Sequence, residues 1–127
     1  MNIGSIFENG SIFSIQGTTQ SCTVGYMPHA KFKGVALKHL VRGEQTGGLL
    51  SCHLVKVDPF CSLETHCHPD NLEIHQVISG TGECSLADVF TNYAPGMVSV
   101  IPQNIPHRVT AEEEPLYILA TFSPALL

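Results

Sequence analysis

The chain has 127 residues, of which 43% are hydrophobic and only 13% are charged. This composition is typical of a single folded domain and excludes an intrinsically disordered chain. The net charge of −5 argues against a nucleic-acid-binding surface, and no apolar run reaches the roughly 18 residues of a membrane span, so we expect neither nucleic acid nor a membrane as a partner.

The first 25 residues have a looser pattern than the rest of the chain. They contain no basic segment followed by a continuous apolar stretch, so we expect no secretory signal. We interpret residues 1–25 as an N-terminal arm or edge strands, and residues 26–127 as a single β barrel. Edge strands can pair with another copy of the chain, and we therefore expect a homodimer.

From residue 26 onward, turn-forming residues separate short runs that are rich in β-branched and aromatic side chains. This pattern is typical of an all-β sandwich or barrel. Alternating apolar positions over 50–54 and 72–77, and a nearly continuous apolar run over 116–122, predict strands. Residues 30–41 also fit a helical stripe, but their valines and Gly34 favour a strand.

Histidine and cysteine are the unusual features of the composition, with seven histidines beside five cysteines and no tryptophan. The cysteines are scattered and odd in number and form no Cys-x-x-Cys pair, which argues against a disulfide framework and a structural zinc knuckle. We therefore expect free thiols in a reducing compartment and place the protein in the cytoplasm.

The most informative stretch is residues 66–73. In a strand, residues two apart face the same side, so His66 and His68 would present two imidazoles together while Cys67 points away. The turn formers at 69–71 predict that the next strand returns antiparallel to the first and brings Glu73 beside the histidines. Two histidines separated by one residue are common by chance, so the turn and the glutamate carry this interpretation.

His107 opens a separate predicted strand after a proline-bounded turn and is the fourth candidate ligand. The four side chains offer three neutral nitrogens and one carboxylate. This donor set suits one divalent ion of iron, manganese, nickel, copper or zinc, and it leaves positions open on a six-coordinate ion.

These motifs resemble those of the cupin superfamily. The first motif starts at His66 and reads HCHPDNLEIHQVISG, and the second runs from Gly96 through Pro102 to His107. The resemblance covers about residues 30–122 and is closest to small single-domain bacterial cupins. It implies a small all-β fold, the antiparallel jelly-roll barrel or double-stranded β-helix. The resemblance also implies that one divalent transition metal per chain is bound by His66, His68, Glu73 and His107.

Three positions depart from the family pattern. Phe60 stands where a glycine usually precedes the first histidine by six residues, and Ala111 stands where the family has a closing asparagine. Asn104 replaces the glycine after the proline of the second motif, but asparagine also tolerates a positive φ, so we expect that turn to be kept. None of the three departures removes a predicted ligand.

His75 shares the predicted inward face of its strand with Glu73. We expect it near the metal, where it could act as a general base or proton carrier, or as a hydrogen-bonded histidine that lines the site.

The other histidines are interpreted as structural, with His29 and His39 at the periphery. The strand parity of His53 and of Tyr117 does not decide whether either side chain reaches the cavity.

Two classes of function fit this sequence. The first is a mononuclear metal-dependent enzyme of dioxygenase, isomerase or lyase type that acts on a small organic substrate. The second is a barrel that binds or senses a small molecule or sugar without turnover. The absence of room for a DNA-binding helix-turn-helix favours the enzyme.

Overall fold

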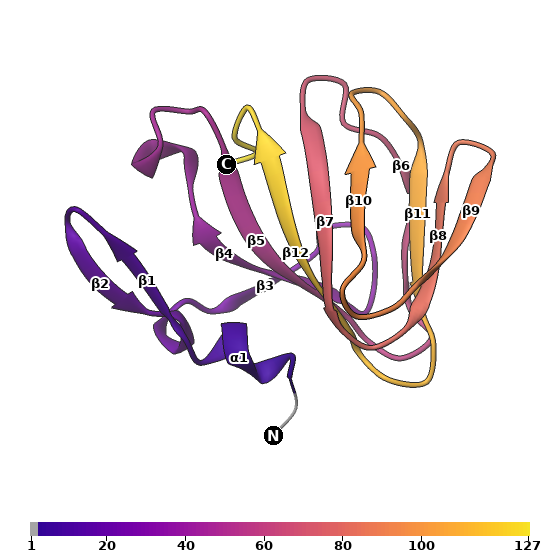
Figure 1. Cartoon of the computed structure of the whole chain (residues 1–127), viewed down its shortest axis with the longest axis horizontal. Helices are drawn as coiled ribbons and strands as arrows, with labels where there is room; N and C mark the ends of the chain where they lie inside the picture. Colours follow the sequence, from indigo (N-terminus) through magenta and orange to yellow (C-terminus); the bar gives the residue numbers. More distant parts are fainter. Residues whose placement is uncertain (1–2) are drawn as a thin grey trace.

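The computed structural model describes residues 3–127, which fold mainly into two facing β-sheets with a separate N-terminal hairpin (Figure 1). In chain order, the elements are α1 (Ser5–Glu8), β1 (Ser11–Ser14), β2 (Gly17–Gln20), η1 (Ser21–Thr23), β3 (Tyr26–Pro28), β4 (Val35–Val41), η2 (Gly43–Gln45), β5 (Ser51–Val57), β6 (Ser62–His66), β7 (Leu72–Ser79), β8 (Gly82–Leu86), β9 (Val89–Tyr93), β10 (Val98–Ile101), β11 (His107–Ala111) and β12 (Leu116–Ser123). Within these residues, no helix is long and apolar enough to cross a membrane.

The larger sheet has six strands in the order β10-β7-β12-β5-β4-β3, and the smaller has four in the order β6-β11-β8-β9. All strand pairs in these two sheets are antiparallel. The predicted antiparallel jelly roll is therefore confirmed, although the two sheets face each other without closing into one cylinder. Residues 35–41 form strand β4, which confirms a strand in the segment that also fitted a helix.

The main core lies between the two sheets, because strands of both sheets direct apolar side chains inward. On β12, Ile118, Ala120 and Phe122 belong to this core, whereas Tyr117 packs in a second cluster with Leu40 on the outer face of the larger sheet. The structure thus places the Tyr117 phenol outside the interior, a point that the apolar run alone could not decide.

The turn after His68 does not form the predicted hairpin. Strand β6 pairs with β11 in the smaller sheet, whereas β7 pairs with β10 and β12 in the larger sheet. Because β7 has a partner on both edges, it has no free backbone groups for β6. The connection therefore crosses from one sheet to the other, and Glu73 approaches the histidines across the interior.

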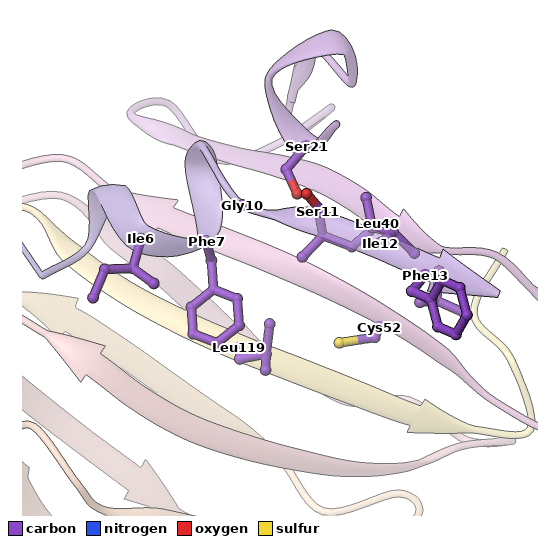
Figure 2. A pocket seen from close by; sticks show the side chains of 11 residues that line it. Ile6, Phe7, Gly10, Ser11, Ile12, Phe13, Ser21, Leu40, Cys52 and Leu119 are labelled. Carbon is purple, nitrogen blue, oxygen red and sulfur yellow. The ribbon is translucent and has the colours of Figure 1, made fainter. Parts of the chain in front are cut away.

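The N-terminal arm lies against the outer face of the larger sheet. Among residues 3–127, strands β1 and β2 pair only with each other, and a groove of about 360 Å³ separates α1 and β1 from the sheet (Figure 2). Ile6, Phe7 and Phe13 line the arm's side of the groove, and Leu40 and Leu119 line the sheet's side. The domain boundary at residue 25 and the homodimer stay predictions.

Candidate metal centre

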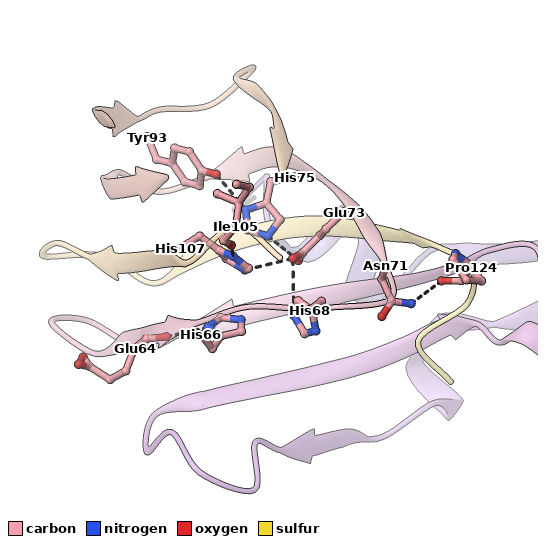
Figure 3. A network of polar contacts seen from close by, with 10 residues as sticks. All are labelled: Glu64, His66, His68, Asn71, Glu73, His75, Tyr93, Ile105, His107 and Pro124. Carbon is pink, nitrogen blue, oxygen red and sulfur yellow. Dashed lines mark hydrogen bonds and ion pairs between the residues drawn. The ribbon is translucent and has the colours of Figure 1, made fainter. Parts of the chain in front are cut away.

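Three histidines from two neighbouring segments meet at one end of the space between the sheets (Figure 3). His66 ends β6 and His107 begins β11, and the two residues are direct cross-strand partners, with ring centroids 4.2 Å apart. His68 follows two residues after His66, with its ring centroid 5.1 Å from the ring of His66. The predicted convergence of these histidines is present in the structure.

A β-bulge in β6 turns His66 towards this cluster. Leu63 pairs with Val109 and His66 pairs with His107, so β6 has one more residue than β11 between these two pairs. The extra residue reverses the alternation of side chains, and Leu63 and His66 both face inward although they are three residues apart. Strict period-two alternation would have placed one of them outside.

Glu73 approaches the same point from β7 in the facing sheet. Its Oε1 atom lies 3.2 Å from His107 Nε2 and 3.7 Å from His68 Nε2. One ligand atom from each of the three histidines lies within 4.8 Å of the others. Two ligands at about 2.1 Å from one ion, separated by about 90° to 109°, lie about 3.0–3.4 Å apart. The Glu73–His107 distance lies within this range, whereas the Glu73–His68 distance and the 4.8 Å limit for the histidines are wider.

The backbone fixes the ring tautomer of two histidines. His66 Nδ1 lies 2.6 Å from the carbonyl oxygen of Glu64, and His107 Nδ1 lies 2.9 Å from that of Ile105. A carbonyl can only accept, so both Nδ1 atoms carry the proton and donate it. Each neutral ring then has a lone pair on Nε2, the arrangement that metal-binding histidines adopt when Nδ1–H is held by a carbonyl.

Two buried polar atoms at the cluster have no hydrogen-bond partner within residues 3–127. They are Glu73 Oε1 and His107 Nε2, the two atoms that point towards each other. Leaving a buried carboxylate oxygen and a ring nitrogen unsatisfied is costly, and a shared cation would satisfy both. The residues present therefore fit a divalent metal ion held by three imidazoles and one carboxylate.

The ionisation of His66, His68 and Glu73 favours metal binding at neutral pH, whereas Glu73 and the carbonyl of Ile105 outweigh burial and raise the pKa of His107, whose proton a metal ion would displace. Burial lowers the pKa of His66 to about 4 and also lowers the pKa of His68, so both rings are neutral and can coordinate. Burial alone would raise the pKa of Glu73, but the neighbouring His75 and His107 outweigh it and hold this pKa below its usual value. The Glu73 carboxylate is therefore ionised.

His75 lies between Glu73 and Tyr93, as Figure 3 shows. On β7, Glu73 and His75 are both buried while Gln76 is exposed, which confirms the predicted inward face. His75 Nε2 lies 2.7 Å from Glu73 Oε2, and His75 Nδ1 lies 2.9 Å from the hydroxyl of Tyr93. With Nε2–H donating to the carboxylate, Nδ1 accepts from Tyr93, so both ring nitrogens are engaged and His75 orients Glu73. A catalytic role for His75 stays a prediction.

This chain of hydrogen bonds predicts a weaker metal site when His75 is replaced. His75→Ala is expected to raise the metal dissociation constant about 10- to 100-fold, because Glu73 loses the donor that orients it. His75→Gln retains an amide donor and is expected to bind metal more tightly than His75→Ala. Competition titration against a chelating dye measures these constants, with Gln76→Ala as the control. Equal affinity of His75→Ala and wild type would contradict the positioning role.

The metal centre opens onto a cavity of about 60 Å³ between the sheets. Its wall is mainly apolar, and the loop residue His29 adds one further polar side chain. The residues that line it are His29, Leu37, Val55, Leu63, His66, His68, Glu73, Phe122 and Leu126.

The sequence interpretation placed His29 at the periphery, and it gave no role to Tyr93. The local pattern does not position either residue: His29 lies in a loop after an edge strand, and Tyr93 is the last residue of β9, at the start of a run of turn-forming residues. The only feature of the sequence that could have indicated a role for His29 is that it is a histidine outside the two motifs. Tyr93 is buried against His75 and had no such signal.

His53 and Cys67 lie outside the metal centre. His53 shares the inner face, but its Nδ1 lies 2.7 Å from His39 Nδ1 and its Nε2 lies 2.8 Å from Ser51 Oγ, so both nitrogens are engaged. Cys67 is exposed and its thiol is 3.8 Å from Asn104 Oδ1, consistent with the predicted outward direction. Asn104 has a φ of 66°, as its turn position predicts.

Comparison with known proteins identifies the fold and family of this arrangement. Residues 53–122, more than half of the chain, match the family model described as a cupin domain. No curated protein sequence matches the chain. Among solved structures, the chain is similar to KdgF from Halomonas sp., with a TM-score of 0.72 and 22% identity over 81% of this chain and 90% of that chain.

Two further solved structures have the same fold. A predicted oxalate decarboxylase from Thermotoga maritima has a TM-score of 0.74 and 20% identity over 83% of this chain and 96% of that chain. The polyketide cyclase RemF from Streptomyces resistomycificus has a TM-score of 0.71 and 19% identity over 83% of this chain and 77% of that chain. At sequence identities of 19–22%, the similarity to these three structures shows a shared fold and nothing about function.

Proposed function

The chain belongs to the cupin family, and on this premise we propose that it is a mononuclear metal-dependent enzyme acting on a small organic substrate, of dioxygenase, isomerase or lyase type. The observation that carries the proposal is that His66, His68 and Glu73, three members of the cluster that also contains His107, line a partly open and mainly apolar cavity. A metal bound there would have ligands on one side and space for a substrate on the other.

The residues of the site have distinct tasks in this proposal. His66, His68 and His107 would hold the metal, and the carboxylate of Glu73 would offset one of its charges. When bound, a divalent ion supplies Lewis-acid polarisation of a substrate oxygen, and a redox-active ion also permits chemistry with dioxygen. The apolar wall, which includes Val55 and Leu63, would pack against the carbon skeleton and exclude water.

Three of the solved structures with this fold have names that describe enzymes or predicted enzymes: an oxalate decarboxylase, an ectoine synthase and a polyketide cyclase. These names support enzyme chemistry on this fold, but they name three different reactions. The alternative, a barrel that binds a small molecule or sugar without turnover, needs the same cavity and differs only in what happens after binding.

The proposal is tested by incubating the metal-loaded protein with 2-hydroxy acids, 2-oxo acids and 1,2-diketones of three to six carbons, with and without dioxygen. Proton NMR follows the compounds over several hours. We expect multiple turnovers of at least one compound and loss of this conversion in the His66→Ala/His107→Ala variant. Saturable binding of a compound to the metal-loaded protein without any conversion across the panel would contradict the enzyme and favour the binding barrel.

A further inference from the structure

His29 lies in a short, hydrogen-bonded loop that borders the metal cavity. The loop spans residues 29–34 between β3 and β4, and it is closed by a hydrogen bond of 2.8 Å from His29 N to the carbonyl oxygen of Val35. Gly34 has a φ of 80°, and any Cβ there would collide with Cys61, so the loop packs closely against the connection between β5 and β6. The position of His29 is therefore set before any ligand binds.

The loop also fixes the proton on the His29 ring. Its Nδ1 accepts hydrogen bonds from the backbone N–H groups of Lys31, at 3.0 Å, and Phe32, at 3.2 Å. Burial lowers the pKa of His29, with a further contribution from Lys31, so the ring is neutral at pH 7. Since Nδ1 is an acceptor, the single proton is on Nε2, which has no hydrogen-bond partner within residues 3–127.

The ring is held in one orientation by stacking. Its centroid lies 4.4 Å from that of Phe32 with an interplanar angle of 13°, and Phe32 in turn contacts the ring of His66 at 5.5 Å. His29 lines the same cavity as His66, His68 and Glu73. The ring that carries this unpartnered Nε2–H is therefore part of the cavity wall, beside the metal-binding cluster.

The charge of the cavity restricts its ligand. A divalent ion with three neutral imidazoles and the Glu73 carboxylate has a net charge of +1, and no other charged side chain lines the cavity among residues 3–127. A net charge in an apolar cavity is costly, so a ligand with one negative charge is the best complement. The volume of about 60 Å³ limits the enclosed part of this ligand to a few non-hydrogen atoms.

We propose that His29 is a ligand-binding residue whose Nε2–H donates a hydrogen bond to a small monoanion with two oxygen functions, such as a short hydroxy or oxo monocarboxylate. One oxygen of the ligand would face the metal and the other would accept from His29, while its short carbon chain packs against Leu37 and Phe122. This assignment rests on the proposed metal site and names the ligand class of that site.

The test compares two substitutions at position 29 in the zinc-loaded full-length protein. His29→Asn keeps an oxygen where Nδ1 accepts from the loop but removes the Nε2 donor, whereas His29→Gln places an amide N–H near the position of Nε2. Calorimetric titration with lactate is the readout, and azide, a monoanion without oxygen, is the control ligand. The zinc dissociation constant of each variant is measured separately.

We expect His29→Asn to weaken lactate binding about tenfold, because it removes one hydrogen bond to the ligand. Its azide and zinc affinities should change less than about twofold. His29→Gln should retain most of the lactate affinity. Three results would overturn the role of His29. They are unchanged lactate binding in His29→Asn, equal losses of lactate affinity in both variants, and no lactate binding to the wild type. Failure of the metal proposal has a different signature, because the wild-type protein would then not bind zinc at the cluster. Absence of turnover would leave the assignment of His29 standing.

Discussion

After reconstitution and desalting, wild-type protein is expected to retain about one divalent ion per chain, and the His66→Ala/His107→Ala variant less than about a tenth of that amount. His66 and His107 are cross-strand partners, and backbone carbonyls hold the proton of each neutral ring on Nδ1, which leaves a lone pair on Nε2. Their replacement leaves two members of the predicted ligand set, His68 and Glu73. Two ligands are too few for a mononuclear site of this kind. Elemental analysis by mass spectrometry measures the ratio.

The double substitution also removes two large rings, so its folding is checked by circular dichroism before the metal is measured. His39→Ala is the control, because His39 belongs to the separate pair with His53 and should leave the metal content unchanged. Equal metal content in the wild type and in a folded double variant would show that the ion binds elsewhere. The predicted ligand set would then be wrong.

The second large expected effect is a loss of stability in mild acid that depends on His53. Burial, with a smaller contribution from His39, lowers the pKa of His53 to about 4 in the folded protein, against 6.5 for an ordinary histidine. Between pH 6.5 and pH 4, the unfolded chain therefore binds a proton that the folded chain does not. The free energy of unfolding falls as the pH decreases through this window, by about 3 kcal/mol from His53 alone.

Urea unfolding of the metal-free protein at a series of pH values from 7.5 to 4 measures this dependence. His53→Asn removes the titrating ring and should flatten the dependence by about 3 kcal/mol relative to wild type. Ser51→Ala is the control, because it removes a hydrogen bond to His53 and keeps the titration. An unchanged pH dependence in His53→Asn would contradict the assignment.

The sequence could predict the parts of the fold that depend on local pattern. Alternation along residues 72–77 identified the buried face of β7, and the spacing of the cupin motifs identified the jelly roll and the three histidines that the structure brings together. The turn at Asn104 was also predictable, because its positive φ is a property of the residue itself.

The remaining features depend on contacts between distant segments. The pairing of β6 with β11 follows from the occupied edges of β7, and the inward direction of His66 follows from a bulge that shifts the register against β11. His29 and Tyr93 reach the site because a loop and a strand end are positioned by the two sheets. No pattern along residues 26–34 or 89–93 contains that information.

The central claim, one metal ion shared by both sheets, is tested most directly by anomalous diffraction from crystals of the metal-loaded protein. We predict a single strong peak about 2.0–2.2 Å from the Nε2 atoms of His66, His68 and His107 and from Glu73 Oε1, facing the cavity. A fully loaded crystal whose strongest peak lies away from these atoms, or whose ion has no contact with Glu73, would contradict it.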